Sequence, residues 1–92
     1  MKINVTQEDI DNGKVRDSDC CPIALALKRD LKCNCAIFPR HSRQGELFIT
    51  HPKAGVTIKT GLPGIANSFA LAFDAGYKES QPFEFNLNVE GI

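Results

Sequence analysis

Apolar and polar residues alternate with the period of a β-strand near both ends of the chain. In the segment Lys2 to Thr6, Ile3 and Val5 share one face and have polar neighbours. The segment 83–90 has the same pattern, with four apolar residues on one face: Phe83, Phe85, Leu87 and Val89. Because successive side chains of a strand point to opposite faces, both segments are predicted to be strands with one face in the core and the other in water.

Three shorter β-like runs lie in the middle of the sequence, at residues 35–38, 46–50 and 56–60. The first two are separated by the polar segment 39–45, which contains a proline and a glycine and is typical of a connecting loop. We therefore expect the first two runs to form an antiparallel pair with a loop at its tip. Residues 52–55 break the chain again before the third run.

Two longer segments have helical periodicity, and each follows or contains a proline. In residues 22–32, Pro22 suits the first helical position, and Ser18, Asp19 or Cys21 can cap the helix. Its apolar stripe consists of Ile23, Ala24, Leu27 and Leu31. The second helix follows the turn 61–64 and runs to about Ala75, with Gly76 as its stop. Its stripe is Ile65, Phe69, Ala72 and Phe73.

A short helix is predicted to follow the first strand. Thr6 can act as its N-cap, while Glu8 and Asp9 suit the positive end of the helix dipole. Gly13 ends this helix, and residues 13–19 are predicted to be an exposed loop. The order of elements predicts an α+β fold, with a four- or five-stranded, largely antiparallel sheet and two main helices on one face. A chain of 92 residues supports one core, so residues 1–92 are expected to form a single domain.

Composition narrows the classes of partner. Eleven basic and eleven acidic residues give a net charge of zero, so no global field draws the chain to nucleic acid or to an anionic membrane. No apolar run approaches the roughly 20 residues of a membrane span, and the first residues do not begin a signal peptide. We therefore expect a cytoplasmic protein that does not enter a membrane, with nucleic acid an unlikely partner.

The four cysteines offer soft ligands but not a recognisable metal motif. Cys20, Cys21, Cys33 and Cys35 do not form paired Cys-x-x-Cys knuckles, and two of them are adjacent. Without a secretory signal, we expect free thiols rather than disulfides, and neither metal nor cofactor. Cys21 at a helix start could serve as a nucleophile with His41 or His51 as base, but no further motif supports this pair. The expectation is a protein that is not an enzyme.

Basic residues are concentrated between positions 20 and 45. This segment contains five Lys or Arg residues and one acidic residue, Asp30. If the 40–43 loop folds near the basic face of the first long helix, the two could bind a phosphate or carboxylate. The strand-to-helix turn at 59–64 could add backbone amides. The candidate ligand-binding residues are Lys28, Arg29, Lys32, Arg40, His41, Arg43, Lys59, Thr60, Gly61 and Gly64. The alternatives are a solvated helix face and a plain tight turn.

Several stretches resemble small uncharacterised proteins encoded by bacteriophages. They are Val5 to Gly13, Cys21 to Leu27 (CPIALAL), Phe73 to Gly76 and Pro82 to Leu87 (PFEFNL). The resemblance implies a viral origin and a place in the host cytosol. It also implies, as candidate roles, countering host defence by trapping a nucleotide-derived signal or by binding a host protein.

Two leucines, Leu25 and Leu71, lie outside the main helical stripes and suggest contacts between subunits. The leading hypothesis is a non-catalytic homo-oligomer that sequesters a small anionic, nucleotide-derived ligand. A second is an inhibitor that binds a host defence protein, for instance through the face carrying Glu84, Asn86, Asn88 and Glu90. A third is a small nucleic-acid-binding protein that uses the basic residues, although no aromatic platform is interleaved with them in the sequence.

Overall fold

The computed structural model describes residues 2–76 and 80–87, and it has the α+β composition expected from the sequence. The elements, in chain order, are β1 (Lys2–Val5), α1 (Gln7–Asn12), α2 (Pro22–Leu31), β2 (Asn34–Phe38), β3 (Glu46–Thr50), β4 (Thr57–Gly61), α3 (Gly64–Asp74) and β5 (Phe83–Asn86). The expected strand positions agree with these bounds to within one or two residues, apart from the C-terminal end of the last strand. Val89, Asn88 and Glu90 lie outside the described residues.

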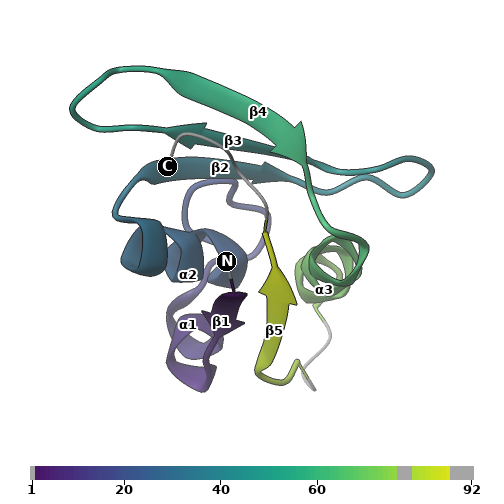
Figure 1. Ribbon diagram of the computed structural model, residues 1–92. Coiled ribbons are helices and arrows are strands. Elements are labelled where there is room, and N and C mark those ends of the chain that lie inside the picture. The colour runs from purple at the N-terminus through teal and green to yellow at the C-terminus, as the bar shows by residue number, and fades with distance from the viewer. Residues whose placement is uncertain (1, 77–79, 88–92) are drawn as a thin grey trace.

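The strands form two antiparallel sheets, where the sequence predicted one (Figure 1). β2, β3 and β4 make a three-stranded sheet, while β1 pairs with β5, so that Ile3 lies opposite Phe85 and Val5 opposite Phe83. The predicted antiparallel pairing of the first two middle strands is confirmed, with Ala36 opposite Phe48. Figure 1 shows α2 and α3 on the same side of the three-stranded sheet, with the β1–β5 pair also on that side.

Helix α2 contacts both sheets. Its buried residues cover about 200° of the helix circumference at 100° per residue, and they are Pro22, Ile23, Ala24, Ala26 and Leu27. The helix packs against β1 on one side and against β2 on another. The helix therefore contacts one strand of each sheet, β1 of the two-stranded sheet and β2 of the three-stranded sheet.

The start of α2 follows the sequence prediction closely. Pro22 occupies the first turn, and the Cys21 sulfur accepts a hydrogen bond from the Ala24 backbone N–H at 3.4 Å. Cys21 is therefore the cap among the three candidates. The helix ends at Lys32, which adopts a left-handed conformation with φ of 55° and donates its backbone N–H to Lys28 O.

Helix α3 is rotated relative to the stripe that its sequence suggested. Ile65, expected in the core, is 56% exposed, whereas Ala66 and Ala70 are buried. Phe69 follows the prediction and packs on Phe83 of β5, with ring centroids 4.6 Å apart. In this orientation the Asn67 side chain bonds the backbone of Arg40, just after β2.

The short helix α1 has the predicted cap. The Thr6 hydroxyl accepts from Asp9 N–H at 3.2 Å, and the Asp9 carboxylate accepts from Thr6 N–H at 2.9 Å, which forms a reciprocal capping box. Within residues 2–76 and 80–87, no helix is long and apolar enough to cross a membrane.

Candidate anion-binding site

Three basic side chains converge on one carboxylate at the end of the three-stranded sheet. Glu46, the first residue of β3, lies 3.3 Å from Arg40 Nη2, 3.9 Å from Arg43 Nη2 and 3.0 Å from Lys59 Nζ. Arg40 and Arg43 come from the loop that joins β2 to β3, and Lys59 comes from β4. We call these four residues the Glu46 cluster.

The strand register explains why residues far apart in sequence meet here. β2 and β4 flank β3, so Glu46 pairs with Phe38 on one side and with Gly61 on the other. The loop after β2 therefore returns directly beside the end of β4. A backbone hydrogen bond of 2.8 Å from Leu62 N–H to Gly45 O joins the loop to the segment that follows β4.

Asn67 holds the base of this loop in place. Its side-chain oxygen accepts from the Arg40 backbone N–H at 3.0 Å, and its side-chain nitrogen donates to the Arg40 carbonyl at 2.9 Å. The pair of bonds resembles one rung of a β-ladder, supplied by a side chain of α3. Gly45 is required close by, because a Cβ at this position would overlap the Asn67 side-chain oxygen.

The electrostatics of the cluster favour an additional anion. Hydrogen bonding to Lys59, followed by the charges of Lys59, Arg40 and Arg43, lowers the pKa of Glu46 from its ordinary value, so this carboxylate is ionised near neutral pH. The Glu46 cluster then contains one negative charge and three positive charges. The Arg43 and Lys59 side chains are 70% and 63% exposed, so their remaining donors are available to a ligand in water.

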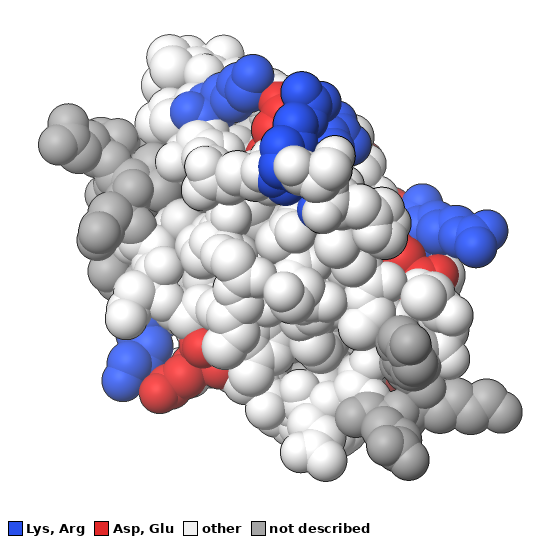
Figure 2. Space-filling model, turned by 90° about the vertical axis from the view of Figure 1, so that its right-hand side faces the viewer, with Lys and Arg blue, Asp and Glu red and all other residues white. Residues whose placement is uncertain are grey.

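The surface around the cluster is shaped to receive a small group. Arg43, Lys59, Thr60 and Gly61 line one shallow pocket of about 360 Å³, with Glu46 at its base. Figure 2 shows basic side chains grouped around an acidic one at the edge of a mostly uncharged face. The structure thus brings together five of the residues expected to bind a ligand: Arg40, Arg43, Lys59, Thr60 and Gly61. Gly64 stands apart from this pocket, at the start of α3.

The basic residues of α2 have other partners. Arg29 donates from Nη1 to both oxygens of Asp9 at 2.8 Å and from Nη2 to the carbonyl of Asn4 at 2.6 Å. The Asp9 hydrogen bond is the main cause of a raised Arg29 pKa. Lys28 donates to the Asp19 carbonyl at 2.5 Å, and Lys32 is the exposed C-cap. Arg29 and Lys28 therefore fix α2 to its surroundings, and none of the three residues lines the pocket of the Glu46 cluster.

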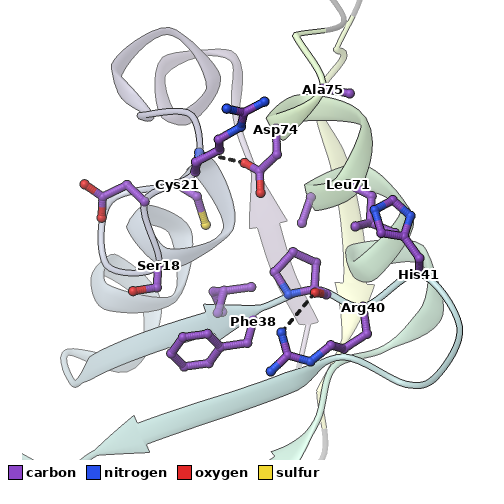
Figure 3. A pocket seen from close by; sticks show the side chains of 13 residues that line it. Ser18, Cys21, Phe38, Arg40, His41, Leu71, Asp74 and Ala75 are labelled. Atoms are coloured by element: carbon purple, nitrogen blue, oxygen red, sulfur yellow. Dashed lines mark hydrogen bonds between the residues drawn. The ribbon is translucent and has the colours of Figure 1, made fainter.

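A larger pocket of about 570 Å³ lies between the 16–21 loop, the end of β2 and the C-terminal half of α3. Cys21 and His41 both line it, and Figure 3 shows them on opposite sides of the pocket, with Arg40 and Leu71 nearer to His41. Within the described residues, no hydrogen bond joins Cys21 to His41. Burial raises the pKa of Cys21 to about 11, so its thiol is protonated at neutral pH and unsuited to nucleophilic attack.

The other cysteines and the second histidine have structural contacts. All four cysteines are free thiols, and burial raises the pKa of Cys35 to about 12. The Cys35 thiol donates to the Ala24 carbonyl at 3.4 Å. His51 Nδ1 accepts from two backbone N–H groups in the turn after β3. Across residues 2–76 and 80–87, no group of three or more His, Cys, Asp or Glu residues is placed to hold a metal ion.

Comparison of the chain with protein-family models, with curated proteins and with solved structures finds no match. The site must therefore be interpreted from its own geometry.

Two residues of the site were not identified from the sequence. The sequence pattern predicts only a strand for Glu46, although this residue stands at the centre of the cluster, and only a helix for Asn67, whose side chain holds the loop. An acidic residue directly after a basic loop and a polar side chain facing away from an apolar stripe are weak signals on their own. Only the β3 register and the rotation of α3 show what these residues contact.

Proposed function

We propose that this protein is a non-catalytic binding protein whose Glu46 cluster holds a small anion that carries a phosphate group. The single observation that carries the proposal is the convergence of Arg40, Arg43 and Lys59 on one carboxylate beside Gly61. Three cations from two elements share one anionic partner, so the cluster has an excess of positive charge in a chain that is neutral as a whole.

The hydrogen-bond donors of the cluster exceed its acceptors. A guanidinium has five N–H donors, whereas Arg43 reaches Glu46 only at 3.9 Å, beyond hydrogen-bond distance. A phosphate offers several acceptor oxygens and matches the planar fork of arginine. Glu46 keeps the three cations near one another without using all of their donors, which favours capture of a second, more highly charged anion.

The proposal is tested by isothermal titration calorimetry with inorganic pyrophosphate at low salt. The double variant Arg43→Gln, Lys59→Gln should bind at least about tenfold more weakly, because a hydrogen bond to a charged group is worth about 1.5–3 kcal/mol. Binding to the unaltered protein should also weaken as salt is added, since these side chains are exposed.

A matched control removes the same charge elsewhere. Lys32 and Lys53 are exposed and lie outside the cluster, so the variant Lys32→Gln, Lys53→Gln should keep the affinity of the unaltered protein within about twofold. Equal losses in the two double variants would mean that binding follows overall charge and not the cluster, and would contradict the proposal.

Assembly into a homo-oligomer stays a prediction. Leu25 and Leu71, which suggested it, are both half-buried, whereas Ile65 on α3 is 56% exposed on a helix whose described residues are uncharged up to Asp74. Sedimentation velocity across a range of protein concentrations measures the oligomeric state directly. A strict monomer would overturn this prediction and leave the anion-binding proposal standing.

A further inference from the structure

The outer face of the three-stranded sheet carries aromatic rings next to the Glu46 cluster. Phe38 of β2 and Phe48 of β3 alternate with the buried residues Ile37, Leu47 and Ile49, so their rings stand on the face opposite the core. In the part of the chain that the structure describes, the helices lie on the other side of this sheet (Figure 1).

Cross-strand pairing arranges this face in rows. One row runs from Phe38 through Glu46 to Gly61, and the next runs from Ala36 through Phe48 to Lys59. Adjacent rows on one face are two residues apart, or about 7 Å along a strand. Ala36 is a small residue in the second row, whereas the Gln44 side chain covers Gly61 and lies where a Cβ of this residue would stand. The charged and aromatic groups are therefore neighbours on a single surface.

The two rings are partly exposed and are linked to the same cations that surround Glu46. The rings of Phe38 and Phe48 pack edge to face, with centroids 5.6 Å apart and planes at 84°. Arg40 Cζ lies 5.9 Å from the Phe38 centroid, and Lys59 Nζ lies 6.0 Å from the Phe48 centroid. Both cations also contact Glu46, at 3.3 and 3.0 Å.

We propose that the anion bound by this protein is a nucleotide, whose phosphate lies at the Glu46 cluster and whose base stacks on the Phe38–Phe48 pair. This inference rests on the proposed function and names its ligand class. A planar base has a π-face that stacks on an aromatic side chain whatever its sequence, and a cation beside the ring adds attraction. Phosphate and base are joined within one nucleotide, and each of the two rows on this surface likewise holds an aromatic residue next to a charged one.

The chemistry separates a nucleotide from simpler anions. Inorganic phosphate or a sugar phosphate would contact the cations but would make no use of the exposed parts of the two rings. Aromatic residues next to basic ones on an open antiparallel sheet are a recurring way of binding unstacked bases. This arrangement cannot be recognised in the sequence, because Phe38, Phe48 and Lys59 belong to three different strands.

The test compares four probes by calorimetry: ribose 5-phosphate, adenosine 5′-monophosphate, uridine 5′-monophosphate and a single-stranded oligothymidylate. Both mononucleotides should bind about tenfold more tightly than ribose 5-phosphate, because stacking of one base contributes an effect of that order. Tighter binding of the oligonucleotide than of either mononucleotide would identify the source as a nucleotide unit within a strand. Tighter binding of the mononucleotides would identify a free nucleotide.

Variants distinguish the contribution of the base to binding from that of the phosphate. Phe48→Leu keeps an apolar side chain on the half-buried position but removes the ring, and it should abolish the preference for nucleotides over ribose 5-phosphate. The control Phe73→Leu removes a half-buried ring from α3, away from this face, and should leave the preference intact. Circular dichroism confirms that each variant is folded.

The outcomes are distinguishable. If nucleotides and ribose 5-phosphate bind equally and Phe48→Leu changes nothing, the base-stacking inference is overturned while anion binding stands. If none of the probes binds, or if the variant Arg43→Gln, Lys59→Gln binds all of them as well as the unaltered protein, the proposed function itself fails.

Discussion

The side-chain amide of Asn67 forms two hydrogen bonds with the backbone of Arg40, accepting from its N–H at 3.0 Å and donating to its carbonyl at 2.9 Å. This contact joins α3 to the loop that follows β2. The loop brings Arg40 and Arg43 to Glu46, and the helix that carries Asn67 has Ile65 exposed to solvent. Fold and candidate site are therefore linked through one uncharged side chain.

Replacing Asn67 by alanine should weaken both the fold and the candidate site. The change leaves the Arg40 N–H and carbonyl without these partners in a half-buried position, so the free energy of unfolding should fall by about 1–3 kcal/mol. Urea denaturation measures this loss. The neighbouring exposed residue offers a control, since Ser68→Ala should change the unfolding free energy by less than about 0.5 kcal/mol. Equal stability of the two variants would contradict the role assigned to Asn67.

The ion pair between the buried Asp9 and the partly exposed Arg29 should contribute to stability. Asp9 is 6% exposed, accepts two bonds from Arg29 Nη1 and also receives the Thr6 N–H. Asp9→Ala removes the carboxylate from all three hydrogen bonds and leaves the Arg29 charge partly in water, so we expect a loss of about 1–3 kcal/mol in the free energy of unfolding.

The same helix supplies the control for Asp9. Asp11 is exposed and contacts only the Gln7 side chain among the described hydrogen bonds, so Asp11→Ala should cost less than about 0.5 kcal/mol. Arg29→Gln should likewise destabilise the fold without changing the affinity for pyrophosphate. A selective loss of pyrophosphate affinity in Arg29→Gln, at unchanged stability, would be incompatible with a structural role for this arginine.

Stability at high pH should depend on Cys21. Burial raises the pKa of its thiol from 9.0 to about 11, so between these values the unfolded chain has lost a proton that the folded chain retains. The stabilisation is fully present below pH 9 and is lost as the pH rises toward 11. Cys21→Ser keeps a helix-capping oxygen and removes the titration, so its stability should decline less over this range in urea denaturation. An identical decline in both proteins would assign the effect to other groups.

Stability at low pH should depend on Glu46 in the opposite sense. Because Lys59 and the two arginines lower the pKa of this carboxyl from 4.5, its contribution is present above pH 4.5 and is lost as the pH falls through the lowered value. Carbon-detected NMR titration of the Glu46 side chain should give a midpoint below 4.5. The variant Lys59→Gln should move this midpoint upward. A midpoint at or above 4.5 in the unaltered protein would show that the cations do not act on Glu46.

Local features of the fold could be predicted because their causes lie within a few residues. Pro22 marks the start of α2, Thr6 and Asp9 form the capping box, and alternation places Phe83 and Phe85 in a strand. In each case the determinant is residue propensity, helix capping or hydrophobic periodicity, and each of these depends on residues that are close in sequence. The α+β composition follows directly from these elements.

The division into two sheets and the rotation of α3 could not be predicted in this way. The width of the buried surface on α2 becomes meaningful only when its neighbours β1 and β2 are known. The apolar period of α3 indicates Ile65 as a core residue, but the helix buries Ala66 and Ala70 and directs Asn67 to the backbone of Arg40. A polar contact over 27 residues leaves no periodic signal in the sequence.

The candidate site was predictable in part. Clustered basic residues and a glycine turn indicated Arg40, Arg43 and the 59–61 segment, and the register of β3 places them together. Charge counting alone could not separate these residues from Lys28 and Arg29, whose partners Asp19 and Asp9 are distant in sequence. The distinction depends on which cations the fold already pairs.

The most direct test of the Glu46 cluster is an NMR titration of the ¹⁵N-labelled protein with pyrophosphate, followed through backbone amide shifts. Binding at the cluster predicts that the largest and saturable shifts occur at Arg43, Gln44, Lys59 and Gly61, with small changes along residues 28–32. Saturable shifts concentrated on residues 28–32, or no saturable shift at any amide, would contradict the assignment of this surface as the anion-binding site.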